Sequence, residues 1–355
     1  MTVKTKRVLN RWFLVLLSVV LIVIISIFKI PSFLKDRSLE NLGYDREAIT
    51  AIKKLKLTKT IIDNDYYSDY LKDEIKKENF KTDYLKLYLN NEALSDDDFL
   101  LYDKLSVKGY SEEELLKLFK ELDFYELTPL LVFDKVNSIS NYISDCKSHT
   151  ENSPTVFNLS NDYLKPYVNT TDVLRLGDVS MLVSQKYYLG DYTPSKLVPL
   201  SSMHASDGVE IDNEAYEAYT ELWDAMMKEG LGIYALSGYR SFETQKSIYD
   251  AYPNSEEADI YVTRPGYAES QTGLSLSVVD ARNERLSTFG ETEEYQYLKK
   301  HAHEYGFIIR YPENKSSITG YNFIPYQIRY VGKDIAKKIH DSNLTYEEYY
   351  LLYLN

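Results

Sequence analysis

The chain has 355 residues, of which 44% are hydrophobic, and this length and composition favour packed domains over a disordered chain. Its net charge of -13 argues against nucleic acid binding, because contacts to phosphates need a basic surface. The single cysteine, Cys146, excludes an intramolecular disulfide and a cysteine-based zinc site.

Residues 12–28 form an apolar run that only Ser18 and Ser26 interrupt. A membrane-spanning helix needs about 17 to 25 such residues. Basic residues precede the run, so the positive-inside rule predicts a cytoplasmic N-terminus and an extracellular C-terminal domain. A cleaved signal peptide is the alternative, but its apolar region is shorter and ends in small residues, which residues 29–34 lack. We therefore predict a cytoplasmic tip and an uncleaved transmembrane anchor over residues 1–34, which makes the chain a single-pass protein of the cell membrane.

Two segments beyond the anchor, residues 42–49 and 108–115, share one pattern. In each, a Gly-Tyr pair precedes a cap residue, Asp45 or Ser111, and an acidic first turn follows. Ser111 with Glu114 has the spacing of a capping box, and acidic residues in a first turn complement the helix dipole. Each segment therefore predicts the start of a helix.

The region over residues 35–131 is predicted to be all-α and built of short helix-turn-helix units. Two imperfect copies are weak evidence for a true repeat. Its charges alternate with apolar residues as on a solvated helix, so the region is a stalk or a surface for a partner protein. Residues 132–175, which are polar and contain Pro154 and Pro166, are interpreted as a connector.

From residue 176 onward, short strands alternate with helices. Apolar or alternating runs predict strands at residues 181–186, 232–236, 274–279, 307–312 and 327–331. Helices are predicted from Asp212 to near Gly230, from the cap residue Ser241 onward, and over residues 292–305. This order predicts an α+β C-terminal domain over residues 176–355, with a small, mostly antiparallel sheet flanked by helices.

Five blocks of this domain carry a resemblance to a known family. They are residues 237–245 (Ser-Gly-Tyr-Arg-Ser-Phe-Glu-Thr-Gln), 264–269 (Arg-Pro-Gly-Tyr-Ala-Glu), 271–274 (Gln-Thr-Gly-Leu), 305–312 (Tyr-Gly-Phe-Ile-Ile-Arg-Tyr-Pro) and 328–332 (Ile-Arg-Tyr-Val-Gly). In content and order they resemble the VanY-type zinc D-alanyl-D-alanine carboxypeptidases. The resemblance implies an enzyme that removes the terminal D-alanine from peptidoglycan stem peptides outside the cell.

The same resemblance exposes a departure at the chemical positions. The family pattern Ser-Glu-His-Gln-Thr-Gly-Leu, with an Asp seven residues after the His, supplies two zinc ligands, and these positions are Ser270 and Ser277 here. The pattern Glu-Pro-Trp-His-x-Arg-Tyr supplies the general base and the third ligand, and these positions are Ile324 and Gln327. All four family side chains are replaced.

These replacements remove the chemistry that the family's reaction needs. A hydrolytic zinc site takes imidazole, carboxylate or thiolate donors, and serine hydroxyls and a carboxamide are poor substitutes. Ile324 cannot accept a proton from water, so a general-base contribution of roughly a hundred to ten-thousand-fold is absent. We therefore predict no metal, no cofactor and no catalytic residue, although the family's cofactor is zinc.

A relocated site would need other donors. The histidines are His149, His204, His301, His303 and His340, and none lies in the expected blocks. Asp280 lies three residues past Ser277, an offset that points to the other face of a regular strand. A serine nucleophile at Ser270 or Ser277 would need a nearby base, and the sequence places none there.

The substrate side of the site keeps its motif identities at Arg240, Ser241, Gln245, Gln271 and Thr272. By the resemblance, Arg240 faces the substrate, and a guanidinium suits a peptide C-terminal carboxylate. The alternative is that these residues hold the loops of the fold together. We predict ligand binding through these five residues.

The sequence thus predicts a membrane-anchored, extracytoplasmic pseudoenzyme that binds peptidoglycan stem peptide or a cell-wall protein, and no nucleic acid. One alternative is an active D,D-carboxypeptidase with an unconventional site. The other is a purely structural scaffold for protein interactions.

Overall fold

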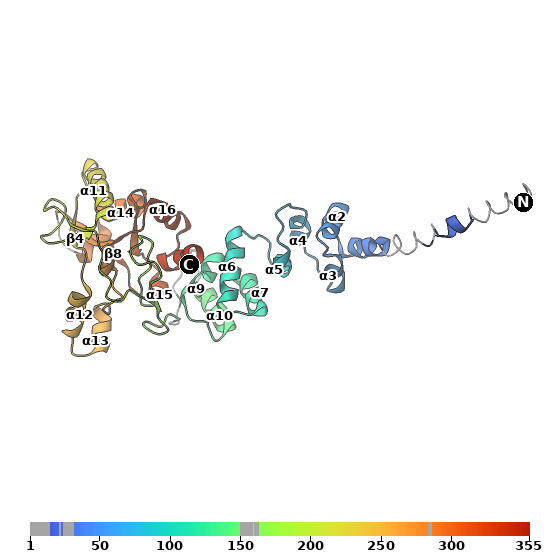
Figure 1. Cartoon of the computed structure of the whole chain (residues 1–355), viewed down its shortest axis with the longest axis horizontal. Helices are drawn as coiled ribbons and strands as arrows, with labels where there is room; N and C mark the ends of the chain where they lie inside the picture. Colours follow the sequence, from blue (N-terminus) through green and yellow to red (C-terminus); the bar gives the residue numbers. More distant parts are fainter. Residues whose placement is uncertain (1–14, 21–22, 24–31, 150–158, 160–162, 283–285) are drawn as a thin grey trace, which may run out of the picture. The chain divides into compact units, whose positions relative to one another are not determined.

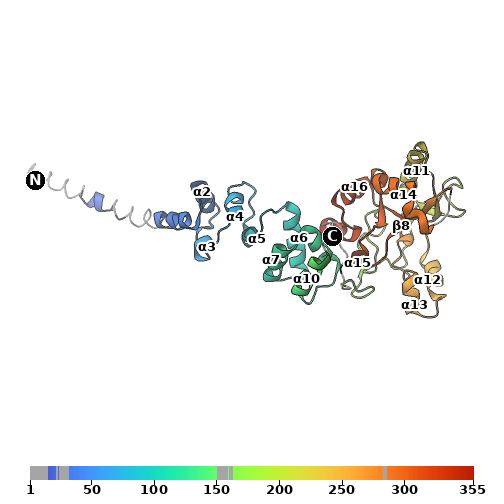
Figure 2. The ribbon, with the colours of Figure 1, turned by 180° about the vertical axis from the view of Figure 1, so that it is seen from behind.

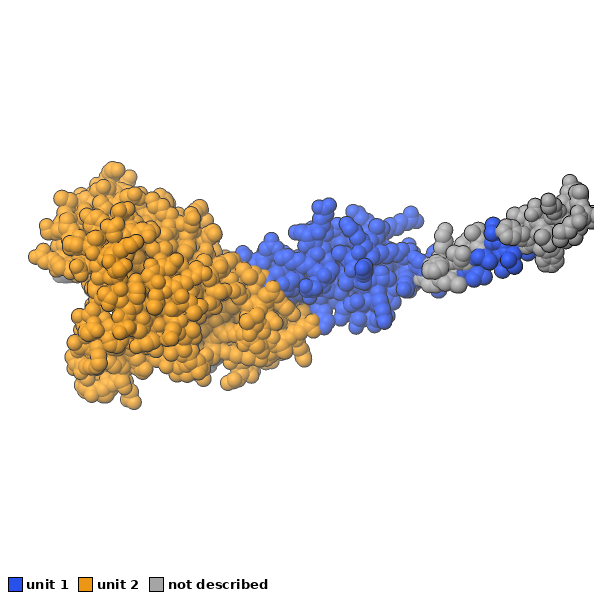
Figure 3. Space-filling view, in the orientation of Figure 1, with its two compact units in different colours: residues 1–99 blue, residues 100–355 orange. Residues whose placement is uncertain are grey.

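The computed structural model describes residues 15–20, 23, 32–149, 159, 163–282 and 286–355. The chain forms two compact units, Met1–Phe99 and Leu100–Asn355, which Figure 3 colours separately. Figure 1 traces the helices and strands of both units along the sequence.

The predicted fold class needs a correction at its N-terminal part. Within the described ranges, no helix is long and apolar enough to cross a membrane. Of the predicted span at residues 12–28, the structure describes only residues 15–20 and 23, and the remainder lies outside the described residues. The transmembrane helix is therefore removed from the fold class, because the short described pieces do not form a spanning element.

The first unit contains short helices separated by tight turns. Residues 32–42 are helical, and the elements that follow are α2 (Arg46–Lys54), α3 (Thr58–Asp63), α4 (Asp69–Glu74), η1 (Thr82–Tyr84) and α5 (Leu85–Asn90). The α-helices each bury at least one apolar side chain, among them Ile52 of α2, Ile61 of α3 and Leu71 of α4. These helices are too short to be stable alone, so tertiary packing holds them.

The Gly-Tyr pairs of the two similar segments have the same local geometry. Gly43 and Gly109 adopt φ values of 114° and 102°, which side chains with a Cβ rarely adopt. The amides of Tyr44 and Tyr110 donate to carbonyls five residues earlier, at 3.1 and 3.2 Å. The preceding helix therefore ends in a Schellman motif in both segments.

The cap residues after these turns behave as the sequence predicts. The Asp45 side chain accepts from the amide of Ala48, at 2.8 Å, and begins α2. Ser111 and Glu114 bond reciprocally, which confirms the predicted capping box at the start of α7 (Glu112–Glu121). A turn and a cap separated by one residue thus set the sharp change of direction between helices.

The second unit includes helices that the sequence analysis assigned to the helical region. They are the C-terminal part of α6 (Asp96–Val107), then α7, α8 (Phe124–Leu127) and most of α9 (Pro129–Val132), whereas α10 (Ile139–His149) falls in the predicted connector. The element α9 packs against α17 (Tyr346–Tyr349) near the C-terminus, and both ribbon views show the C-terminus beside these helices (Figures 1 and 2). The hydroxyl of Thr128 donates to Glu348 at 2.7 Å, and both side chains are fully buried. Residues 100–131 therefore fold with the C-terminal domain.

A four-stranded antiparallel sheet in the order β5-β6-β8-β7 forms the centre of the C-terminal domain. Its strands are β5 (Ile233–Ser237), β6 (Ser275–Asp280), β7 (Phe307–Tyr311) and β8 (Ile324–Tyr330). Two small sheets accompany it, formed by β1 (Thr171–Asp172) with β2 (Tyr187–Tyr188), and by β3 (Leu197–Pro199) with β4 (Glu210–Asp212).

Helices surround this sheet. Figures 1 and 2 both show α11 (Asn213–Lys228), α14 (Glu293–His301) and α16 (Lys333–Ser342) grouped together, with α12 (Phe242–Asp250) and α13 (Ser255–Tyr261) away from them. Shorter turns complete the domain: η2 (Glu269–Thr272), η3 (Leu286–Glu291), η4 (Ala302–Tyr305), α15 (Ser316–Thr319) and the π-helical η5 (Tyr350–Leu354).

The predicted helix from Asp212 is confirmed as α11. The Asp212 side chain caps it by accepting from the amide of Glu214, at 2.9 Å. Its apolar face is buried in the core of the domain, at Ala215, Tyr219, Leu222 and Met226. The predicted helix over residues 292–305 is also present, but its last turn is the 3-10 helix η4.

The predicted strand at residues 181–186 is wrong, because this stretch is irregular and β2 begins only at Tyr187. Its apolar side chains are buried, as a strand pattern suggests, but its carbonyls bond to side chains. The carbonyl of Met181 accepts from Arg329 at 2.8 Å, and that of Val183 accepts from Arg310 at 3.0 Å. The guanidinium groups of Arg310 and Arg329 therefore donate the hydrogen bonds that a neighbouring strand would donate to these carbonyls.

Candidate functional site

A cleft of about 730 Å³ opens beside strands β5, β6 and β8. All four positions that the sequence analysis identified as replaced line it: Ser270, Ser277, Ile324 and Gln327. They come from η2, β6 and β8, where Ile324 is the first residue of the strand and Gln327 lies at its middle. The fold thus brings together residues that are up to 57 positions apart in the sequence, from 270 to 327.

The strand register places three polar residues of the cleft in one row. Ser277 of β6 pairs with Ser237 of β5 on one side and with Gln327 of β8 on the other. The register shifts between Ala235 and Ser237 on β5, and a shift of this kind re-aims side chains next to it. A second shift, opposite β7, precedes the Ile324 pairing with Tyr311.

The side chains of this row differ in their hydrogen bonds. The Gln327 amide donates to the hydroxyl of Ser275 at 2.7 Å, and Ser275 in turn donates to the carbonyl of Ile328 at 3.0 Å. The hydroxyls of Ser270 and Ser277 have no hydrogen-bond partner among the described residues. Two hydroxyls are therefore available to a ligand in the cleft, while the Gln327 amide is partly occupied.

Arg240 supplies the cleft with a positive charge. It lies three residues after the end of β5, and its backbone amide donates to the carbonyl of Ser270 at 3.1 Å. Its guanidinium donates to the side-chain oxygen of Gln245 at 2.9 Å, and the Gln245 amide donates to the carbonyl of Thr263 at 2.6 Å. Gln245 is thus bonded at both ends of its amide, so it holds Arg240 in place.

The charge of Arg240 has no acidic partner within the described part of the chain. Burial lowers the pKa of its guanidinium below the ordinary value, but an arginine stays protonated at neutral pH. A half-buried cation without a counter-charge, lining an open cleft, is suited to bind an anionic group.

The other three predicted binding residues have structural contacts instead of a place in the cleft wall. Ser241 accepts from the amide of Thr244 at 3.1 Å and so caps α12, as the sequence predicts. Gln271 is fully buried and donates to the carbonyls of Gly190 and Tyr192, at 2.8 and 3.1 Å. Thr272 bonds within its own turn. These residues shape the loops around the cleft, and their predicted ligand contacts stay a prediction.

Comparison with known proteins places the domain in a family. The profile of VanY, D-alanyl-D-alanine carboxypeptidase, matches residues 208–333. YodJ of Bacillus subtilis (strain 168), a carboxypeptidase by its name, is 38% identical over 217 residues, which are 58% of this chain and 79% of YodJ. The chain belongs to the VanY family of D-alanyl-D-alanine carboxypeptidases.

Two further matches are a curated enzyme and a solved structure. The D-alanyl-D-alanine carboxypeptidase of Enterococcus faecium is 29% identical over 219 residues, 59% of this chain and 67% of that protein. The solved structure of the LdcB LD-carboxypeptidase, described with its basis of peptidoglycan recognition, is 36% identical, covers 52% of this chain and 92% of its own, and superposes with a TM-score of 0.48. The two curated relatives are thus carboxypeptidases by their names.

The zinc ion of VanY-type enzymes does not fit the residues of this cleft. The ligand positions offer two hydroxyls and one carboxamide, which are weak zinc donors, and an isoleucine lies where a base is needed. Among the described residues, only two carboxylates line the cleft, Asp259 and Glu269, and arginines bind both. Within the described ranges, no group of three or more His, Cys, Asp or Glu side chains is arranged to hold a metal ion.

Glu269 belongs to a buried charge cluster behind the cleft. One carboxylate oxygen accepts from Arg310 at 2.5 Å and the other from Arg329, and Arg310 also binds Glu347 of α17 at 2.6 Å. Burial alone would raise the pKa of Glu269, but Arg329 and Arg310 outweigh it and hold that pKa below its ordinary value. Glu269 is therefore an ionised, fully engaged carboxylate and not a free base.

Asp280 and the histidines with described side chains lie outside the cleft wall. His204 packs beside Trp223, with ring centroids 4.7 Å apart, and His301 bonds to Glu304 at 2.8 Å. Asp280, at the far end of β6, pairs with Arg282 at 3.2 Å. His303 and His340 line a separate cavity, and the side chain of His149 lies outside the described residues.

Sequence reasoning missed several residues of the cleft, of which Gln185 is the most informative. Only 7% of Gln185 is exposed, and its side-chain oxygen has no partner among the described atoms. Its amide donates to the carbonyl of Gly320 at 3.3 Å. Aromatic residues also line the cleft, at Tyr261, Tyr311, Tyr321 and Tyr326. Gln185 fell in the wrongly predicted strand, and no local pattern marks it.

Proposed function

We propose that this VanY-family protein binds the carboxylate end of a peptide, most directly a peptidoglycan stem peptide, without hydrolysing it. One observation carries the proposal: Arg240 offers an unpaired guanidinium to the same cleft in which the ligand and base positions are Ser270, Ser277, Gln327 and Ile324. Such a cleft keeps a group that recognises a carboxylate and lacks the groups that activate water.

The absence of hydrolysis follows from the donor chemistry. Water attack needs a metal-bound or base-activated water, and neither hydroxyls nor a carboxamide hold zinc well. Ile324 is apolar at every pH, so it takes no proton. The two carboxylates of the cleft are neutralised by arginines, which lowers their basicity.

The first experiment measures zinc content and D-alanine release from a stem pentapeptide by the purified full chain. We expect less than stoichiometric zinc and no release above the blank. Stoichiometric zinc together with turnover would contradict the pseudoenzyme proposal and support an active D,D-carboxypeptidase with an unconventional site.

The second experiment titrates stem peptides into the chain by calorimetry. Arg240→Met removes the cation while keeping an unbranched side chain, and we expect about a ten- to hundredfold loss of affinity, because hydrogen bonds to charged groups contribute roughly 1.5 to 3 kcal/mol. Lys246→Met is the matched control, since Lys246 is an exposed cation of α12 that does not line the cleft. The same peptide with an amidated C-terminus should bind the parent as weakly as the acid binds Arg240→Met.

A third experiment distinguishes a peptide-binding protein from a purely structural scaffold. It also tests whether the four replaced positions account for the predicted lack of activity. No heat from parent or variant, with any stem peptide, would leave the scaffold or a cell-wall protein as partner. Activity after combining Ser270→His, Ser277→Asp, Ile324→Glu and Gln327→His, with zinc added, would support the assignment of these positions, and an inert but folded quadruple variant would oppose it.

We also propose that the domain acts outside the cytoplasm, because that is where stem peptides are attached to the cell wall. The measurement is digestion of the C-terminal domain by protease added to intact protoplasts. Protection of the domain until the cells are lysed would refute this location.

A further inference from the structure

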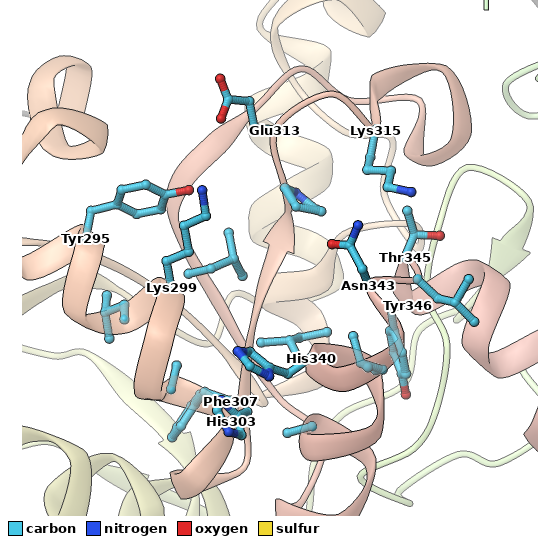
Figure 4. Close-up of a pocket in the computed structure, with 18 of the residues that line it drawn as sticks. Tyr295, Lys299, His303, Phe307, Glu313, Lys315, His340, Asn343, Thr345 and Tyr346 are labelled. Carbon is cyan, nitrogen blue, oxygen red and sulfur yellow. The ribbon is translucent and has the colours of Figure 1, made fainter. Parts of the chain in front are cut away.

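The C-terminal domain contains a second cavity, of about 410 Å³, between α14, η4, β7 and α16 (Figure 4). It shares no lining residue with the cleft that contains Arg240. Its wall is part apolar and part polar, and the apolar lining includes Leu298, Phe307, Ile309, Ile339 and Leu344. A concave site that combines apolar surface with polar groups is the usual form of a site for a small molecule.

Lys315 is the polar group that distinguishes this cavity. Only 3% of Lys315 is exposed, it lines the cavity, and its ammonium has no hydrogen-bond or ion-pair partner among the described residues. Lys186 provides the contrast, because it is also buried, at 7% exposed, but pairs with Asp134 at 3.0 Å and donates to a carbonyl at 2.7 Å. The domain thus pairs one buried lysine and leaves the other open to a cavity.

A second lysine faces the same space. Figure 4 shows Lys299 of α14 and Lys315, from the loop after β7, on opposite sides of the cavity. The one acidic residue in the wall, Glu313, is exposed and forms no ion pair with either lysine. The cavity therefore has an excess of positive charge, although the whole chain has a net charge of -13.

The chemistry of the missing partner follows from these contacts. The Lys315 ammonium is open to the cavity and has no counter-charge among the described residues, so a bound anion would supply one. Leu298, Phe307 and Leu344 would cover the apolar body of the same molecule. We propose that this cavity binds a small organic anion, with its carboxylate or phosphate against Lys315 and its apolar body against the wall.

The test uses anilinonaphthalene sulfonate, an apolar dye with one anionic group, and the full chain at neutral pH. We expect saturable fluorescence with the parent, about tenfold weaker binding to Lys315→Met, and near-parent binding to Lys315→Arg, since a charge-assisted contact contributes roughly this factor. Arg240→Met is the matched control for dye in the cleft. Absence of saturable binding, unchanged binding to Lys315→Met, or an equal loss in Arg240→Met would each overturn the proposal.

Displacement of the dye identifies the head group. Hexanoate competing better than phenyl phosphate assigns a carboxylate, and the reverse assigns a phosphate. Hexanol is the neutral comparison, and displacement by hexanol as strong as by either anion would overturn the role of charge.

Thermal unfolding without dye distinguishes a binding lysine from a structural one. Because the ammonium has no partner among the described residues, Lys315→Met should not lower the unfolding temperature, although it weakens dye binding. A lower unfolding temperature would mean that Lys315 stabilises the fold through its charge, which contradicts the proposal.

Discussion

Single charged residues in the C-terminal domain have contrasting partners. Glu269 is shared between Arg310 and Arg329, so its charge is compensated within the protein. Arg240 has only Gln245, and Lys315 has no partner among the described residues. Paired charges hold the fold together, whereas the uncompensated cations line the two cavities.

The buried ion pairs of Glu269 with Arg310 and Arg329 give a prediction for the stability of the fold. Glu269→Gln leaves two fully buried arginines without the carboxylate that joins them, so we expect a loss of about 3 to 5 kcal/mol in the free energy of unfolding. Urea unfolding of the full chain measures it. Glu304→Gln is the control, because Glu304 is exposed and its removal should change stability by no more than about 0.5 kcal/mol. Equal effects from both substitutions would contradict the importance of the buried cluster.

The residues of the cleft were predictable to different degrees. Arg240 and Gln245 stand in one continuous motif on a helix start, so the sequence alone placed them near each other. Ser241 was also predicted as a cap, and that is the contact it makes. Gln185 and Lys315 reach their cavities through packing of distant segments, and no local pattern encodes such packing.

At the scale of elements, the sequence predicts helix caps and the spacing of apolar residues better than it predicts which segments pair as strands. The helix from Asp212 and the strands of the central sheet follow from apolar spacing. Residues 181–186 have the same apolar spacing but are not a strand, because Arg310 and Arg329 bond to the carbonyls of this stretch. Only the fold reveals that competition, since both arginines come from later strands.

The contact between η4 and α16 predicts a pH dependence. His303 and His340 stack with ring centroids 3.8 Å apart. Burial lowers the pKa of His303 below its ordinary value, His340 and Lys337 act in the same direction, and Glu304 and Asp341 oppose them. The unfolded chain, with an ordinary histidine pKa of about 6.5, therefore binds a proton that the folded chain resists.

Stability should consequently be highest above about pH 6.5 and fall as the pH drops towards the lowered pKa of His303. His303→Gln removes this titration, so its unfolding free energy should change less than that of the parent between pH 7.5 and 5. Urea unfolding at several pH values measures the difference. An unchanged slope in His303→Gln would refute this origin.

At the scale of the whole molecule, the chain divides at a place that the sequence did not indicate. The sequence placed a change of region at residue 131, where the helical pattern gives way to polar residues. In the structure, the division between the two compact units falls between Phe99 and Leu100, within α6. The reason is that α9 packs on α17, so Thr128 and Glu348, 220 residues apart, share a buried hydrogen bond.

This division predicts how fragments behave. A fragment of residues 95–355 keeps Ser95, whose side chain bonds to Asp98 at the start of α6, and should unfold in urea at the same midpoint as the second unit of the full chain. A fragment of residues 176–355 loses α9 and leaves the buried carboxylate of Glu348 without Thr128, so we expect it to be less stable by about 3 kcal/mol or more. Thr128→Val in the longer fragment separates the hydrogen bond from the apolar contact, because it removes the hydroxyl and keeps the shape. If the fragment of residues 176–355 is as stable as the longer one, the helices from α7 to α10 are an appendage and not part of the second folding unit.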